Sequence, residues 1–388
     1  MYSKMSGTIS ISRLIALTKS CQSKSLALTD INTVRGFINF VHSAQEKGIA
    51  PIAGVNLITN VDEVIILAEN HIGYENICRS ITDYYINPDR SVADILKQRS
   101  DGLFVLTYYP SLLEKLRDFM SDTQLFIELR PGMKERAVQK LSKKYKLEII
   151  ATGDIYFQDP EDHETHKILR AINKNTTLKH LKDGDYKSAD HWFRDETAMA
   201  RLFPNSLDAI HNSHYLGKRC KREWSFVNTI FPGLSLKDTY QSNKKLRDYA
   251  YQGAMMRYEK ITDDIKQRID YEMNLIIQKG FAPYFLIVRD IVSQTRSTIG
   301  RGSAAASIVS YCLFITQVDP IKYNLFFDRF IHPERIDMPD IDIDFPWDER
   351  DNIIDYVFKK YGNDRTAMVS NQVFLKPRSA IREVGKVY

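Results

Sequence analysis

The sequence predicts an α/β fold with more than one domain, and three observations support this prediction. In residues 1–172, short apolar runs alternate with segments of helical spacing, which is typical of repeated strand–helix units in a sheet or barrel. From residue 244 onwards, long amphipathic helices replace that pattern. Residues 340–345 then alternate acidic and apolar side chains with the period of a β-strand. A chain of 388 residues is long enough for two or three domains with cores of their own.

The expected strands of the first region are short and mainly apolar. They are residues 26–28, 51–57, 64–67, 103–106, 125–129 and 149–151. Helices are expected at residues 11–23, 34–47, 74–85, 111–120 and 134–144. Two of the strands end in polar residues, at Thr29-Asp30 and at Thr152-Gly153-Asp154. Because sites in such folds form at the carboxyl ends of strands, both segments are candidates for a site.

The first domain is predicted to span residues 1–225, with a mostly helical tail from residue 173. Residues 226–243 contain Pro232 and Gly233 and are predicted to be a linker. The second domain is predicted to span residues 244–388. Its expected elements are helices at 244–260, 263–278, 284–296 and 348–361, the acidic strand, a strand at 367–369 and a helix from residue 378.

Composition favours a cytoplasmic protein without a membrane partner. The four cysteines are scattered singly, which argues against a zinc ribbon or a disulfide framework and favours a reducing compartment. The N-terminus lacks the apolar core of a signal peptide, and no apolar run is long enough to cross a bilayer. Residues 320–358 are acidic between two basic segments, which suits a metal site beside a phosphate track, although uneven surface charge would give the same pattern.

The acidic strand is the strongest chemical signal. Asp340, Asp342 and Asp344 alternate with apolar residues, so we expect their carboxylates on one face and the apolar side chains on a core. Carboxylates in such a row repel one another unless a cation lies among them, and Mg²⁺ prefers oxygen ligands. The alternative is an edge strand with a solvated acidic face. Pro339 and Pro346 bracket the strand and favour the anchored arrangement.

The second signal is the turn Gly300-Arg301-Gly302-Ser303, which precedes a run of small and apolar residues. Glycine lets backbone N–H groups approach an anion closely, Ser303 is expected to cap a following helix, and Arg301 adds a phosphate donor. Alone this signal is weak, because similar turns are common in loops. Together with the acidic strand, it predicts a site for a nucleoside triphosphate and metal ions.

Four segments resemble the first part of the palm of bacterial DNA polymerase III alpha subunits, the family C polymerases. They are residues 268–288, 300–307, 319–345 and 381–388, and they include the motifs GRGSAAAS and DIDIDF. The resemblance implies an α+β palm like that of nucleotidyltransferases. It also implies a DNA-directed DNA polymerase, replicative or error-prone, that transfers nucleotides to a primer 3′-hydroxyl with two Mg²⁺ ions.

The same resemblance implies roles for particular residues. Asp342 and Asp344 would be catalytic metal ligands, with Asp340 as a flanking metal-binding acid. The implied nucleotide-binding residues are Arg301, Gly302, Ser303, Arg378 and Arg382. A surface role for the last two is equally open. The implied partners are primer-template DNA, deoxynucleoside triphosphates and replisome subunits, namely the sliding clamp and the exonuclease subunit.

The first region resembles the polymerase-and-histidinol-phosphatase (PHP) domain, which implies a (β/α) barrel. Segments such as LALTDINTVRGFINF and ATGDIYFQDPED show the resemblance. In metal-binding members of that family, Ile31, Asn56 and Tyr156 would be His, Glu and His, and the opening His-x-His motif is also absent. The remaining Asp30 and Asp154 are too few for a metal cluster, so we expect a vestigial site in a structural domain.

The family's third catalytic carboxylate lies on a later palm strand, so we expect no polymerase activity from these 388 residues alone. Two other classes of function fit the sequence. One is a metal-dependent phosphoesterase or 3′–5′ exonuclease built on the first domain. The other is a non-catalytic module that binds DNA or a replisome partner.

Overall fold

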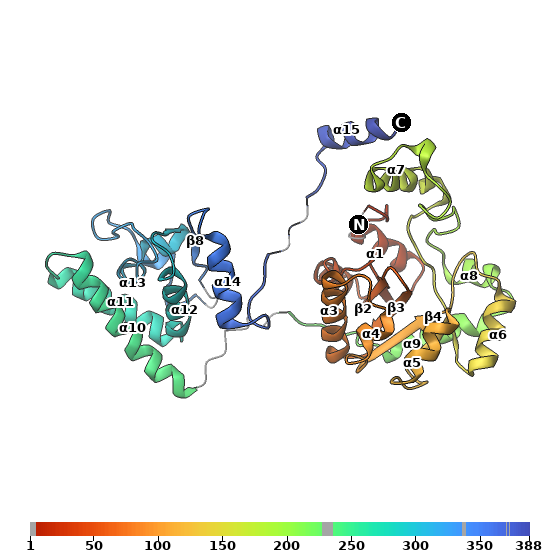
Figure 1. The fold of residues 1–388 in the computed structure, drawn as a ribbon, viewed down its shortest axis with the longest axis horizontal. Helices are drawn as coiled ribbons and strands as arrows, with labels where there is room; N and C mark the ends of the chain where they lie inside the picture. The colour runs from red at the N-terminus through yellow and green to blue at the C-terminus, as the bar shows by residue number, and fades with distance from the viewer. Residues whose placement is uncertain (1–4, 227–235, 336–338, 370, 372) are drawn as a thin grey trace. The chain divides into compact units, whose positions relative to one another are not determined.

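The computed structural model describes residues 5–226, 236–335, 339–369, 371 and 373–388. The chain forms two units, Met1–Phe226 with Val373–Tyr388, and Val227–Gln372 (Figure 1). The C-terminal helix α15 (Pro377–Val387) packs on α7 (His163–Lys174) of the first unit. The predicted second domain, residues 244–388, is therefore divided between the two units. The sequence shows which face of a helix is apolar, but it does not show which neighbouring element packs against that face.

A six-stranded sheet organises the first unit, with its strands in chain order. They are β1 (Ser25–Leu28), β2 (Ala50–Ile58), β3 (Glu63–Ala68), β4 (Leu103–Thr107), β5 (Leu125–Leu129) and β6 (Ile149–Ala151). β1 and β2 are parallel, as are β4, β5 and β6, while β3 runs antiparallel to both of its neighbours. Strands β1 and β6 line one cavity, so the sheet curls into a half-barrel. The predicted α/β class and PHP-like architecture are confirmed.

Alternation along the strands gives the sheet two different faces. On β2, Ala53, Val55 and Leu57 point into the large outer core, while Ile52 and Asn56 line the inner cavity. The inner face is apolar in its middle and polar toward the carboxyl ends of the strands, where Glu128 follows Phe126 on β5. The site of this unit lies at that polar end.

Helices cover the sheet from outside, except for α9, which contacts β6 and β1. The helices of this unit are α1 (Ile11–Ser20), α2 (Phe37–Glu46), α3 (His71–Ile86), α4 (Val92–Leu96), α5 (Pro110–Arg117), α6 (Glu135–Tyr145), α7, α8 (Glu196–Leu202), α9 (Leu207–Arg219) and α15. Leu216 of α9 and Cys220, directly after this helix, pack on the inner face of the sheet. No helix among the described residues is long and apolar enough to cross a membrane.

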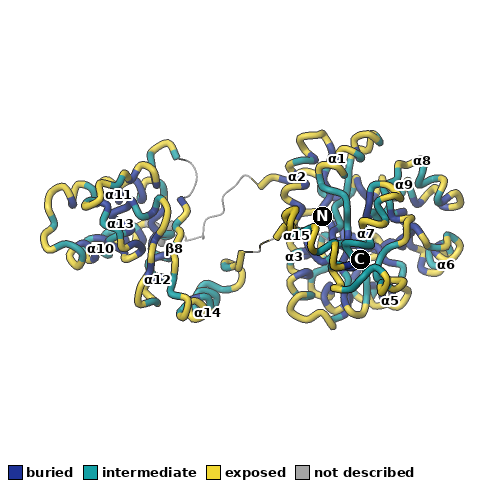
Figure 2. The backbone as a smooth tube through the Cα atoms, turned by 90° about the horizontal axis from the view of Figure 1, so that it is seen from above, coloured by how far each residue is buried: buried dark blue, intermediate teal, exposed yellow. Residues whose placement is uncertain are grey.

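The second unit is mainly helical. Its helices are α10 (Leu236–Arg257), α11 (Asp263–Gln278), α12 (Ala282–Val292), α13 (Ile308–Cys312) and α14 (Arg350–Tyr361), and its strands are β7 (Ile299–Arg301) and β8 (Asp342–Asp344). The core gathers buried side chains of α11, α12 and the loop after α13, among them Met273, Phe285 and Phe330. Figure 2 shows these buried segments enclosed by exposed ones. The small β7–β8 sheet lies at the edge of this core and carries the predicted acidic residues.

The strand expected at residues 367–369 is absent, because this segment has no regular structure. Met368 is 66% exposed and Val369 is 88% exposed. The apolar, β-branched sequence favours a strand locally, but no described strand pairs with this segment. That prediction was wrong.

Close packing between α10 and α13 gives a test of the second unit. A Cβ atom at Gly253 would lie 1.8 Å from the carbonyl oxygen of Cys312, which is a backbone atom that cannot rotate away. We expect Gly253→Ala to lower the free energy of unfolding by at least about 1 kcal/mol, because overpacking outweighs the gain in helix propensity. Urea denaturation followed by circular dichroism would measure this change.

The matched control is Gly385→Ala on α15, where an added Cβ meets no atom within 4 Å. This variant should be neutral or more stable by up to about 1 kcal/mol, since only helix propensity changes. Equal stability of the two variants would contradict the close approach of α10 to α13.

Candidate functional site

The acidic residues of the second unit lie on the antiparallel β7–β8 pair. In the observed register, Arg301 is opposite Asp342, and Ile299 is opposite Asp344. Asp342 and Asp344 are exposed, whereas Ile343 between them is half-buried against the core. The alternation of the strand therefore places both carboxylates on its solvent side and uses the apolar residues as the anchor.

Asp340 is also exposed, but it precedes the paired part of the strand. Strand β8 itself thus presents two carboxylates. Within the described ranges, no group of three or more His, Cys, Asp and Glu side chains is arranged to hold a metal ion. A metal ion at β8 would need further ligands from water or substrate.

The glycine turn lies directly beside this strand. Gly302 has a φ of 65°, a left-handed conformation that favours glycine, and a Cβ atom there would be 3.6 Å from Oδ2 of Asp342. At Gly300, a Cβ atom would lie 2.7 Å from the carbonyl oxygen of Ile315. The two positions therefore require glycine for different reasons, Gly302 because of its backbone conformation and Gly300 because of a close contact. Together they bring the backbone of the turn next to the Asp342 carboxylate.

The expected cap by Ser303 is replaced by another serine. Gly302–Ala306 forms a 3-10 helix without a capping side chain, and Ser307 caps the following α13 by accepting a hydrogen bond from the Ser310 N–H at 3.1 Å. The cap prediction for Ser303 was wrong because the tight turn at Gly302 delays the start of the α-helix. Ser303 is half-buried at the start of the 3-10 helix.

Arg301 forms an ion pair with the acidic strand. Its Nε atom lies 2.8 Å from Oδ2 of Asp344, and both side chains are more than half exposed. Exposed ion pairs contribute only about 0–1 kcal/mol, so an incoming anion could compete for this guanidinium at little cost. Arg301 therefore lies where it neutralises part of the acidic strand and is open to solvent.

A buried carboxylate, Glu272 of α11, holds the far end of the turn. It accepts hydrogen bonds from the Ser307 hydroxyl at 2.7 Å, the Val309 N–H at 3.2 Å and the Arg268 Nε at 2.7 Å. Burial raises the pKa of Glu272, and the bonds from Ser307 and Arg268 only partly offset this effect. Arg268 also donates to the carbonyl of Ala306 at 3.2 Å. These two residues fix the 3-10 helix to α11.

The roles of Glu272 and Arg268 in holding the turn were not predicted from the sequence. The available signal was an Arg–Glu pair four residues apart on an otherwise apolar helix face, inside the segment 268–288. The partner hydroxyl of Ser307 lies 35 residues away, so its position was not predictable from local pattern. Arg378 and Arg382 lie on α15 of the first unit, and their contact with phosphate stays a prediction.

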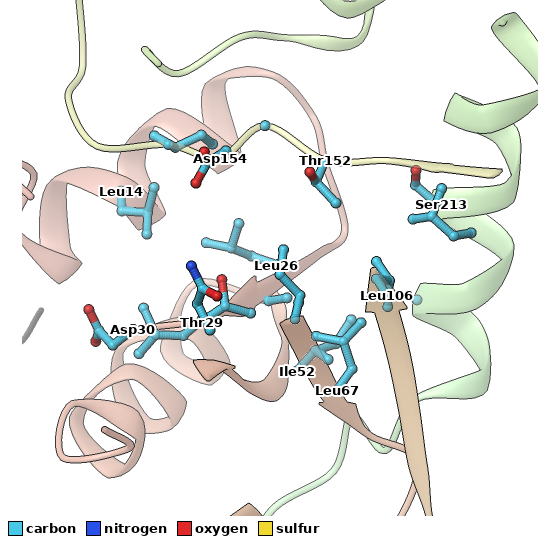
Figure 3. Close-up of a pocket in the computed structure, with 18 of the residues that line it drawn as sticks. Leu14, Leu26, Thr29, Asp30, Ile52, Leu67, Leu106, Thr152, Asp154 and Ser213 are labelled. Carbon is cyan, nitrogen blue, oxygen red and sulfur yellow. The ribbon is translucent and has the colours of Figure 1, made fainter. Parts of the chain in front are cut away.

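The polar site of the first unit contains both residues predicted there. Asp30 is buried, Asp154 is half-buried with a side chain that is only 7% exposed, and both line the same cavity (Figure 3). The carboxylate of Asp154 lies 2.9 Å from the Lys187 Nζ and 3.2 Å from the His191 Nδ1. Burial alone would raise the pKa of Asp154, but these two residues and the charge of Arg130 hold it well below its usual value.

Arg130 is the centre of the charges around Asp154. Its Nη1 lies 2.9 Å from the Glu63 Oε1 and 3.8 Å from the Glu128 Oε2, and its Nε lies 4.0 Å from the Asp154 carboxylate. Burial raises the pKa of Glu63, but the hydrogen bond and charge of Arg130 lower it below its usual value. One guanidinium thus serves three carboxylates, as a metal ion would. We call Glu63, Glu128, Arg130, Asp154, Lys187 and His191 the Arg130 network.

Most members of the Arg130 network were not predicted. Arg130 follows β5 directly, while Glu63 lies 67 residues earlier at the start of β3. The contact between Arg130 and Glu63 depends on the antiparallel direction of β3, which was not predicted from the sequence. A charged pair at the ends of two strands was the only local signal. Within the network, side-chain cations already pair with the carboxylates that a metal ion would need as ligands.

Burial of Glu128 gives this site a measurable pH dependence. Burial raises the pKa of Glu128 to about 7 from a usual 4.5, although Arg130 and Thr152 oppose the shift. Its contribution to stability is therefore fully present below about pH 4.5 and is lost as the pH rises to about 7. The free energy of unfolding of Glu128→Gln, relative to the wild type, should increase across this range, because glutamine stays uncharged.

The measurement is urea denaturation at several pH values. Glu161→Gln changes an exposed glutamate of the same unit and should show no such trend, because this side chain is exposed in the folded and unfolded chain alike. A flat difference between Glu128→Gln and the wild type would show that Glu128 is not buried as described.

Comparison with known families identifies both parts of the chain. Residues 1–157 match the PHP domain, and residues 244–388 match the bacterial DNA polymerase III alpha NTPase domain. An amidohydrolase structure from Chromobacterium violaceum covers 39% of this chain and 84% of its own, at 12% identity and a TM-score of 0.30. That TM-score is too low to support an argument about the fold.

Curated relatives align with nearly the whole of this chain. The DNA polymerase III subunit alpha of Treponema pallidum is 30% identical and aligns with 100% of this chain and 37% of its own length. The DNA polymerase III subunit alpha of Borreliella burgdorferi is also 30% identical and aligns with 100% of this chain and 38% of its own length. The error-prone DNA polymerase of Symbiobacterium thermophilum is 30% identical and aligns with 99% of this chain and 40% of its own length. The chain thus spans less than half the length of these relatives. The chain thus joins a region of the PHP domain family to a region of the bacterial DNA polymerase III alpha NTPase domain family, and it is similar along its whole length to DNA polymerase III alpha subunits.

Proposed function

We propose that this chain provides the acidic strand and the phosphate-binding turn of a DNA polymerase, which transfers nucleotides to a primer 3′-hydroxyl under the direction of a template. The observation that supports this proposal most is the position of Asp342 and Asp344 on one exposed face, with Gly302 beside Asp342. This arrangement occurs in the region that matches the polymerase III alpha family. Carboxylates next to a glycine turn suit an enzyme that handles a triphosphate and metal ions.

Asp342 and Asp344 fit a site for Mg²⁺. This ion is usually held by one or two carboxylates, while water and substrate phosphates complete its octahedral shell. The two exposed carboxylates of β8 leave room for those ligands, and Asp340 adds negative charge at the flank. When bound, a pair of Mg²⁺ ions would supply the charge that activates the attacking hydroxyl and neutralises the leaving pyrophosphate.

The turn would hold the triphosphate. The backbone at Gly302 and the hydroxyl of Ser303 would donate hydrogen bonds to phosphate oxygens, and Arg301 would exchange Asp344 for phosphate. Glu272 and Arg268 would keep the turn in place through Ser307 and Ala306. The choice of nucleotide would come from pairing with the template, because phosphate contacts carry no sequence information.

The substrates of this function are deoxynucleoside triphosphates and primer-template DNA, and its setting is the bacterial cytoplasm. Replisome subunits such as the sliding clamp and the exonuclease subunit are the partners that the family suggests. The relatives include both polymerase III alpha subunits and an error-prone polymerase, so both types of polymerase fit this chain.

For residues 1–226 we propose a structural role with a degenerate metal site. A phosphoesterase or exonuclease of the PHP type would need metal ions among the carboxylates at the ends of the strands. In this chain, Arg130 and Lys187 already neutralise Glu63, Glu128 and Asp154. A buried cation in that position opposes a second one, which disfavours metal-dependent hydrolysis in this unit.

The metal site of β8 can be tested with Mn²⁺, which substitutes for Mg²⁺ and is visible by electron paramagnetic resonance. We expect the 388-residue chain to bind Mn²⁺ weakly and to bind it more tightly when a deoxynucleoside triphosphate is added, since phosphate oxygens complete the shell. The double change Asp342→Asn with Asp344→Asn should weaken Mn²⁺ binding by about tenfold or more, because both charged ligands are lost.

Asp351→Asn is the matched control for the Mn²⁺ titration. Asp351 is an exposed aspartate of the same unit that pairs with Arg350 on α14, and its loss should leave Mn²⁺ binding unchanged. Equal Mn²⁺ affinity of the wild type and the double variant would refute the metal site. If the wild type bound DNA but not Mn²⁺, and the double change left its DNA affinity unaltered, the chain would be a non-catalytic DNA-binding module instead.

A further inference from the structure

The net charge of the protein is concentrated on one helix of the first unit, α6. Residues 134–146, which include this helix, contain six Lys and Arg residues and one Glu, which gives them a net charge of +5. The whole chain also has a formal net charge of +5, so its other residues are neutral overall. A strongly basic helix on an otherwise neutral protein is a candidate surface for an anionic partner.

Three of these basic residues lie on the side of α6 that faces away from the sheet. Val138 and Tyr145 are buried, and this side of the helix packs on β5 and β6. Arg136, Lys140 and Lys143 are exposed, and their spacing of four and three residues places them on one helix face. Tyr145 follows Arg136 by about two and a half turns, which puts the two residues on opposite sides. We call Arg136, Lys140 and Lys143 the α6 stripe, and Figure 2 shows α6 at the periphery of the first unit.

The charges of the α6 stripe are not neutralised by carboxylates of the structure described above. Over those ranges, no Asp or Glu forms an ion pair with a residue of the stripe, whereas the neighbouring Lys144 lies 3.6 Å from Glu114. Glu135 is the one acidic residue of the helix. Its carboxylate accepts hydrogen bonds from the Asn205 N–H at 3.0 Å and the Asn205 Nδ2 at 3.3 Å, so it is engaged by the loop before α9. The three cations are therefore available to a partner.

The geometry of the α6 stripe fits the backbone of duplex DNA. Arg136 and Lys143 are separated by about 10 Å along the helix axis. Each strand of duplex DNA carries a phosphate for about every 3.4 Å of its axis, so this length matches about three phosphates. Single strands are commonly bound by stacking on aromatic side chains, but Tyr145 is the aromatic residue of α6 and it is buried. The apolar side of α6 is buried as well, which disfavours insertion into a membrane.

We propose that the α6 stripe binds the phosphate backbone of duplex DNA. Each of its three cations contacts one phosphate and releases the counterions that this phosphate held. Such contacts position a duplex and carry no sequence information. The identity of the partner rests on the polymerase function proposed above, which supplies DNA as the substrate.

The salt dependence of DNA binding tests this proposal. Fluorescence anisotropy would measure the affinity of the whole chain for a duplex between about 50 and 200 mM salt, with EDTA and without triphosphate. The triple change Arg136→Gln, Lys140→Gln and Lys143→Gln should reduce the slope of log K against log salt by about two to three, because each lost phosphate contact removes about 0.9. It should also weaken binding by at least about tenfold at the lowest salt concentration.

The matched control removes the same charge elsewhere in the first unit. Lys19→Gln, Lys97→Gln and Lys179→Gln change exposed side chains that are far apart in the sequence, and together they should alter the slope by less than about one. Glutamine has nearly the helix propensity of lysine and arginine, so the variant of the α6 stripe should fold, as circular dichroism would show. Should it fail to fold, Lys140→Gln alone should reduce the slope by about one.

Three results would overturn the proposal. These are no binding of the duplex by the wild type at low salt, the same slope for the wild type and the variant of the α6 stripe, and an equal loss of slope in the control variant. Tighter binding of a single strand of the same length, or of polyglutamate, would also contradict it, because the partner would then be a different polyanion. The variant of the α6 stripe should bind Mn²⁺ like the wild type, so the Mn²⁺ titration distinguishes a failure of the metal site from a failure of this surface.

Discussion

Carboxylates that gather at the ends of strands must be neutralised, and this constraint governs both units of the protein. In the first unit, Glu63, Glu128 and Asp154 are withdrawn from solvent, where an unpaired charge would cost several kcal/mol. The guanidinium of Arg130 meets this requirement from within the chain. In the second unit, Asp342 and Asp344 are exposed, and water screens their repulsion. The same side chains therefore form a closed structural network in one unit and an open site in the other.

The difference follows from where each strand lies. β5 lies between β4 and β6 in its sheet and all its residues are buried, so charged residues at its end must be paired inside the protein. β8 belongs to a two-stranded sheet at the edge of its core, and its acidic face meets solvent. Its nearest cation, Arg301, pairs with Asp344 through an exposed contact that is easily exchanged. An open site needs carboxylates that are incompletely neutralised, and β8 provides them.

Much of the fold was predictable from local pattern, because period-two and helical spacing are local properties. The six strands of the first unit and most long helices of the second were predicted close to their observed positions, but α10 begins at Leu236, inside the predicted linker 226–243. The wrong predictions have a local cause in one case and a distant partner in the other. The turn at Gly302 makes Ser307 the cap in place of Ser303, and no described strand pairs with residues 367–369. Asp30 and Asp154 were predicted from the sequence as site residues, but Arg130 was not.

Arg130 also explains how this unit remains folded with several carboxylates withdrawn from solvent at the ends of its strands. Without a counter-charge, these carboxylates would cost about 3–5 kcal/mol for each broken pair. A guanidinium at the centre removes that cost, since its five donors serve several carboxylates at once. The Asn56 amide adds to this arrangement, because its Nδ2 donates a hydrogen bond to the Glu63 Oε1 at 3.1 Å. The charge of the carboxylates at these strand ends is thus met by side chains of the same unit and not by solvent.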